Sequence, residues 1–249
     1  MRLEFPTDLG LIVPVVMSLL SLRLFRLAVR TRRLPEVLVG VYFLLVPFAI
    51  SLAIRVDRFD PADAAAVRAT SNGLFTLGGV ALLLFAWSVF RPDATWAKAL
   101  AWGGSAILVA VWAAGIPAGA YQTGSTGFLV LLPVFASYSW VFAESQRYYG
   151  LLRRRRKLGL VDPVLANRFL LFAIWTGCVV AITVLGVAGA VYQMLSGGFQ
   201  EGGGLGNPVI LGVTRVLSLP IVVSIWLTFL APARYQAWLR RDRIEQTAA

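Results

Sequence analysis

The sequence predicts a single all-α membrane protein, a bundle of seven transmembrane helices with its N-terminus outside and its C-terminus in the cytoplasm. Two observations predict this fold class. Seven apolar segments fill most of the 249 residues, and clusters of Arg and Lys fall in alternate gaps between them. Composition agrees, because 58% hydrophobic residues and a mean hydropathy of +0.76 exceed what a soluble domain of this size can bury. We therefore expect one domain, residues 1–249.

Each apolar segment is long enough to cross a bilayer. At about 1.5 Å per residue, a hydrocarbon core about 30 Å thick needs about 20 apolar residues. Arg23 and Arg26 interrupt the first segment, but they lie near one end, where long side chains reach the headgroups. The predicted spans are 9–28, 35–55, 72–91, 96–121, 126–148, 166–195 and 207–232.

Basic residues in the gaps predict the orientation. The even gaps carry little net positive charge: three Asp offset the basic residues of 55–68, 121–126 is uncharged, and 196–206 holds only Glu201. The odd gaps and the tail hold Arg30, Arg32 and Arg33; Arg91 and Lys98; Arg153 to Lys157; and Arg234, Arg240, Arg241 and Arg243. By the positive-inside rule, the odd gaps and the tail are cytoplasmic.

The net charge of +11 follows from this topology, so we expect membrane lipids and no nucleic acid as partners. The run from Arg153 to Lys157 should attract anionic lipid of the inner leaflet. The excess of Arg over Lys suggests a high-GC bacterial genome, which places the chain in a bacterial inner (cytoplasmic) membrane.

Local signals predict two helix starts and one loop. Asp60-Pro61 and Asp162-Pro163 each offer an N-cap acid followed by Pro at the first helical position. The third helix should therefore begin in solvent, before its span. The glycine-rich segment 196–206 is expected to form a flexible outer loop.

The chain also shows internal similarity. Residues 34–45 align without gaps on residues 160–171, and each stretch follows an arginine run. We interpret this as a parallel repeat of 9–92 and 126–232, joined by a linker helix at 96–121. Constraints shared by all membrane helices are the alternative explanation.

This three-plus-one-plus-three arrangement resembles, distantly, the group of seven-helix proteins that contains microbial rhodopsins, SWEET-type sugar transporters and G-protein-coupled receptors. The resemblance implies a fold and not a function. The motifs of the group differ here: both lysines, Lys98 and Lys157, lie in predicted cytoplasmic gaps, so helix 7 offers no amine for retinal. Pro14 and Pro133 are followed by Val, where the sugar transporters have Gln. We expect no retinal and no other cofactor.

The chain contains no His, which removes most metal sites and most general-base arrangements. Serines within the spans have no base to activate them, so they are better explained as polar contacts between helices. We therefore expect no enzymatic activity and no metal.

Arg215 is the one charge well inside a span. It lies eight residues beyond Asn207, about 12 Å along helix 7, in its outer half. Burying it costs at least about 2.5 kcal/mol, so it either reaches carbonyls or headgroups, or it binds an anion. The candidate ligand site comprises Arg215, Tyr121 and Tyr192 at outer helix ends, Ser218, and Trp112, whose alternative role is core packing; the loop acid Glu201 is a further candidate partner for the arginine.

A second polar group is expected at the inner helix ends. Its members could close the cytoplasmic face by ion pairing or couple helix movements, and exposed pairs of this kind are usually weak. They are Glu36, Glu144, Arg147, Asn167 and Arg168.

Together these features favour a non-enzymatic, receptor-like or sensor-like protein that binds a small or lipid-like anionic ligand from the outer side. One alternative is a small-solute transporter that works by rocking of the two repeats. The other is a structural subunit of a larger membrane complex.

Overall fold

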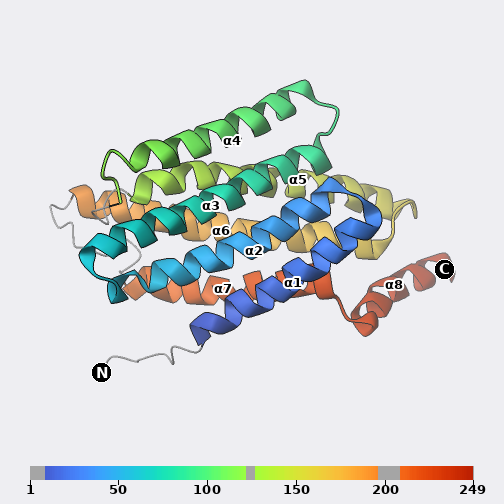
Figure 1. Cartoon of the computed structure of the whole chain (residues 1–249). Helices are drawn as coiled ribbons and strands as arrows, with labels where there is room; N and C mark the ends of the chain where they lie inside the picture. Colours follow the sequence, from blue (N-terminus) through green and yellow to red (C-terminus); the bar gives the residue numbers. More distant parts are fainter. Residues whose placement is uncertain (1–8, 122–126, 196–207, 249) are drawn as a thin grey trace. The chain divides into compact units, whose positions relative to one another are not determined.

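The computed structural model describes residues 9–121, 127–195 and 208–248, and the regular elements in these ranges are all helical (Figure 1). They comprise eight α-helices and one short 3₁₀-helix. Within the described ranges, five stretches are long and apolar enough to cross a membrane, which makes this an integral membrane protein. These stretches are Leu34–Ile54, Asp63–Phe90, Thr95–Gly115, Pro163–Gly189 and Gly212–Leu230. The count of seven spans and their orientation stay predictions.

The chain divides into two compact units, with the boundary inside one helix, α5 (Gly127–Lys157), between Ser137 and Tyr138. The first unit contains α1 (Leu9–Thr31), α2 (Leu34–Ile54), the 3₁₀-helix η1 (Val56–Arg58), α3 (Pro61–Phe90), α4 (Thr95–Gly115) and the first part of α5. The second unit contains the rest of α5, α6 (Pro163–Leu195), α7 (Pro208–Leu230) and α8 (Ala233–Ala248).

In the first unit, helices adjacent in sequence pack against each other, α1 on α2, α2 on α3 and α3 on α4. Small residues and hydroxyls allow this close approach, as is common in membranes. Ser21 Oγ of α1 donates a 2.8 Å hydrogen bond to the Gly40 carbonyl of α2. A Cβ at Gly78 of α3 would lie 2.5 Å from Val46 Cγ2, so only glycine fits this crossing.

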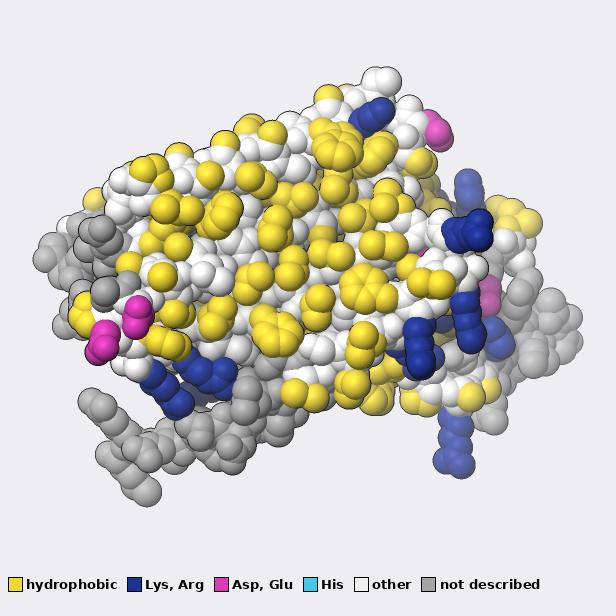
Figure 2. Space-filling view, viewed as in Figure 1, with side chains coloured by type: hydrophobic (Ala, Val, Ile, Leu, Met, Phe, Trp, Pro, Cys, Tyr) yellow, Lys and Arg dark blue, Asp and Glu magenta, His cyan; other side chains and the backbone are white. Residues whose placement is uncertain are grey.

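The outer surface of this unit has the character of a lipid-facing surface. Figure 2 shows hydrophobic side chains over the middle of the face made by α1 to α4, while Lys, Arg, Asp and Glu side chains gather near the two ends. Large apolar side chains are exposed there; Ile107, for example, is 60% exposed. Contact of so many apolar side chains with water would be unfavourable.

The core of the second unit is an aromatic cluster. Trp175 of α6 is 1% exposed, and its ring meets Tyr138 of α5 edge-on at 6.4 Å and Phe172 at 5.0 Å. Phe172 in turn meets Phe229 of α7 at 6.5 Å. Edge-to-face pairs are worth about 0.5–1.5 kcal/mol each beyond burial, so this cluster fastens α5, α6 and α7 together.

Two predicted helix starts are confirmed: α3 begins at Pro61 and α6 at Pro163. Asp162 Oδ1 accepts a 3.0 Å hydrogen bond from the Val164 backbone N–H, as an N-cap acid should. Asp60 occupies the N-cap position of α3 but makes no such side-chain hydrogen bond. The predicted outer loop at 196–206, with Glu201, lies outside the described residues.

Two predicted ends are wrong. The fifth span was expected to end at 148, but α5 continues to Lys157, so the basic residues 153–157 lie within the helix and not after it. The fourth span was expected to reach residue 121, but α4 ends at Gly115. Pro117 has no backbone N–H and disfavours helical geometry in the residue before it, so the chain turns. Gly119 continues the turn with a φ of 67°, a value that suits glycine.

Candidate functional site

Arg215 is the eighth residue of α7 and is exposed. Leu219, Val222 and Trp226 follow it at intervals of four, three and four residues, which places all four side chains on one face of the helix. These three apolar residues are 69%, 52% and 50% exposed. The face is therefore an arginine followed by an apolar stripe; together they extend about 16 Å along the helix and are called the α7 stripe below.

Next to the arginine, Ser218 is also exposed, and its Oγ donates a 2.7 Å hydrogen bond to the Thr214 carbonyl. The hydroxyl lone pairs remain able to accept a hydrogen bond. Tyr192 is exposed near the end of α6, and Arg215 lies near the start of α7, so both belong to the end of the α6–α7 pair that the 196–207 connection joins. Arg215 and Tyr192 thus lie toward the same end of the second unit, and Ser218 lies nearer the middle of α7.

Tyr121 and Trp112, the other two predicted ligand residues, belong to the first unit and contact each other. Tyr121 is 4% exposed, and its Oη donates a 3.0 Å hydrogen bond to the Trp112 carbonyl. The physical reason is the end of α4. The Ile116 N–H bonds to the Ala113 carbonyl rather than to Trp112, which frees the Trp112 carbonyl for the tyrosine.

The same two residues also join the end of α4 to α3. Trp112 Nε1 donates to the Ala69 carbonyl at 2.9 Å, and Arg68 Nη1 approaches the Tyr121 carbonyl at 3.4 Å. A Cβ at Gly73 would lie 2.9 Å from the Trp112 ring. Burial raises the pKa of Tyr121. Tyr121 and Trp112 therefore both take part in the packing of this unit, and their role in a ligand site stays a prediction.

The members of the predicted inner group belong to both units, and their network stays a prediction. Glu36 is half-buried in the first turn of α2, in the first unit, while the other four residues belong to the second. Asn167 Nδ2 of α6 donates a 2.9 Å hydrogen bond to Tyr235 Oη of α8, a residue outside the prediction. Arg147 and Arg168 are exposed.

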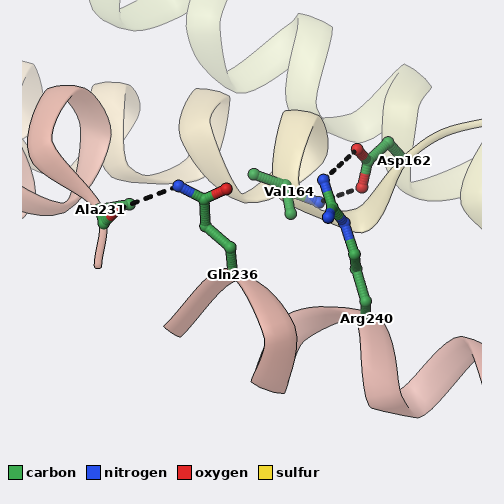
Figure 3. A network of polar contacts seen from close by, with 5 residues as sticks. All are labelled: Asp162, Val164, Ala231, Gln236 and Arg240. Atoms are coloured by element: carbon green, nitrogen blue, oxygen red, sulfur yellow. Dashed lines mark hydrogen bonds and ion pairs between the residues drawn. The ribbon is translucent and has the colours of Figure 1, made fainter. Parts of the chain in front are cut away.

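Helix α8 also contributes an ion pair that the sequence reasoning missed. Figure 3 shows Arg240 reaching the N-cap acid Asp162, with Arg240 Nη2 and Asp162 Oδ2 3.4 Å apart. The same view shows Gln236 Nε2 donating to the Ala231 carbonyl at 2.9 Å. The two side chains of the pair are 57% and 46% exposed, so the pair itself adds little stability and mainly orients α8.

At the end of α5, Arg153, Arg154 and Arg155 are exposed on the last turns of the helix, which continues to Lys157. Among the described residues, no group of three His, Cys, Asp or Glu side chains could hold a metal ion.

No protein-family model matches the chain, and no curated protein or solved structure is significantly similar to it. The fold alone therefore defines the class of this protein, a helical integral membrane protein.

Proposed function

We propose that this chain is a non-enzymatic, receptor-like protein of the bacterial inner membrane that binds an anionic, lipid-like ligand from the outer side. The ligand lies along the α7 stripe. Binding needs neither retinal nor another cofactor, and neither a metal nor a nucleic acid takes part.

The α7 stripe supports this proposal because its polar part suits the anionic group of an amphipathic ligand and its apolar part suits the hydrocarbon tail. A guanidinium presents parallel N–H donors that suit a carboxylate or phosphate, and Ser218 adds a hydroxyl one turn away. Beyond the arginine, Leu219, Val222 and Trp226 offer exposed apolar surface to a hydrocarbon tail. A charge-assisted hydrogen bond contributes about 1.5–3 kcal/mol, which offsets the cost of placing Arg215 in a span.

The test compares two substitutions at Arg215 by counting co-purified anionic lipids in native mass spectra. Arg215→Met should keep the fold, because Met suits an apolar surface, and should lose the bound anion. Arg215→Lys should restore it only in part, since an ammonium lacks the two-pronged geometry.

Arg23→Met is the matched control, since Arg23 is also an exposed arginine in an apolar segment. It should leave the lipid count at the α7 stripe unchanged. Unchanged anion occupancy in Arg215→Met, or a stoichiometric partner protein that co-purifies through the α7 stripe, would refute the proposal; the second result would favour a structural subunit.

A further inference from the structure

The first two turns of α8 have two different faces. Tyr235 and Leu239 face the protein: Tyr235 accepts the bond from Asn167, and Leu239 is 7% exposed. The next position in each turn is also occupied: Gln236 donates a hydrogen bond to the Ala231 carbonyl, and Arg240 donates one to Asp162. The remaining positions are exposed and form what we call the free face of α8; they are Ala233, Arg234, Ala237 and Trp238.

The depth of this face follows from the contacts of α8. Tyr235 contacts α6 at Asn167, and Arg240 contacts it at Asp162, immediately before the apolar stretch that begins at Pro163. Helix α7 ends its own apolar stretch at Leu230, and only two residues separate Leu230 from the start of α8 at Ala233. The free face therefore lies at the level where two membrane-crossing stretches end, which is the headgroup region.

The residues of the free face suit that region. Trp238 is 57% exposed, and its ring stacks on that of Tyr235, with the ring centroids 5.9 Å apart and the planes at 27°. Arg234 lies one turn before it on the same face. An exposed Trp beside an Arg at the end of a span is typical of side chains that contact lipid headgroups.

We propose that the free face of α8, through Arg234 and Trp238, binds the headgroups of anionic phospholipids in the surrounding bilayer. This surface is separate from the α7 stripe, which extends from Arg215 to Trp226 within α7, and from the arginine run that ends α5. It is independent of the proposed function, because it would anchor α8 whether or not a ligand occupies the stripe.

The test uses the full-length protein in nanodiscs of phosphatidylglycerol and phosphatidylcholine in equal parts, with only one of the two lipids brominated at a time. Bromine quenches nearby Trp fluorescence, and the signal lost in Trp238→Phe isolates the contribution of Trp238. One basic residue at the surface should enrich anionic lipid about fivefold. We therefore expect the Trp238 signal to be quenched more strongly by brominated phosphatidylglycerol, and equally by both lipids in Arg234→Gln.

Arg58→Gln, an exposed arginine in η1 of the first unit, removes the same charge elsewhere and should keep the lipid preference. Equal quenching by the two lipids in the wild-type protein would overturn the proposal. Absence of quenching by either lipid would also overturn it, because Trp238 would then face water or a protein.

Discussion

Substituting Tyr121 by Phe tests whether its hydroxyl caps α4 rather than serving a ligand. The change removes the donor of the 3.0 Å bond to the Trp112 carbonyl and leaves the ring in place. Because Ile116 bonds elsewhere and Tyr121 is 4% exposed, the Trp112 carbonyl loses this donor at a site that water scarcely reaches. An unsatisfied buried acceptor costs about 1–3 kcal/mol, so we expect the free energy of unfolding to fall by about 1–2 kcal/mol.

The assay is reversible unfolding in mixed detergent micelles, with Tyr192→Phe as the matched control. Tyr192 is 71% exposed, so its hydroxyl should contribute within about 0.5 kcal/mol of zero. If Tyr121→Phe proved as harmless as Tyr192→Phe, the capping role would be wrong.

The stability difference between the wild type and Tyr121→Phe should also depend on pH. Burial raises the pKa of Tyr121 above its unfolded value of about 10, so its neutral form is favoured by folding. The stability that this contributes is complete below about pH 10 and is lost as the pH rises through the folded pKa. The stability difference between the wild type and Tyr121→Phe should therefore narrow above about pH 10. A difference that grew with pH would contradict the assignment.

Three further predictions concern topology, chromophore and packing. In a Cys178→Ser background, an impermeant thiol reagent added outside should label a cysteine placed at 203 but not one at 155; the reverse pattern would invert the predicted orientation. Protein incubated with all-trans retinal should develop no visible absorption band, and a band abolished by hydroxylamine would contradict the absence of a helix 7 amine. Gly78→Ala should destabilise the first unit by about 1–3 kcal/mol, and adding Val46→Ala should restore most of the loss, whereas equal effects of the single and double variants would exclude this contact as the cause.

The helices themselves could be predicted because apolar length and Pro placement are local signals. The second span was expected at 35–55 and α2 covers Leu34–Ile54, while α3 and α6 begin at the prolines that follow Asp60 and Asp162. Helix α8 was missed, because a short polar helix after Pro232 carries no pattern that a search for spans detects.

The candidate site could be predicted only residue by residue. Arg215 could be identified as a candidate site residue because a charged side chain within an apolar stretch is rare. The hydrogen bond from the Tyr121 hydroxyl to the Trp112 carbonyl depends on where α4 ends. The end was expected at residue 121, but the helix ends at Gly115. Likewise, the hydrogen bond between Asn167 and Tyr235 joins residues that are 68 positions apart in sequence, and no local sequence pattern predicts it.

The most direct test of the central claim is a density map of the purified protein reconstituted with its native lipids. The proposal predicts an elongated density on α7, with its polar end at Arg215 and Ser218 and its tail along Leu219, Val222 and Trp226. A stripe covered by unordered lipid alone, with Arg215 turned to backbone carbonyls, would contradict it.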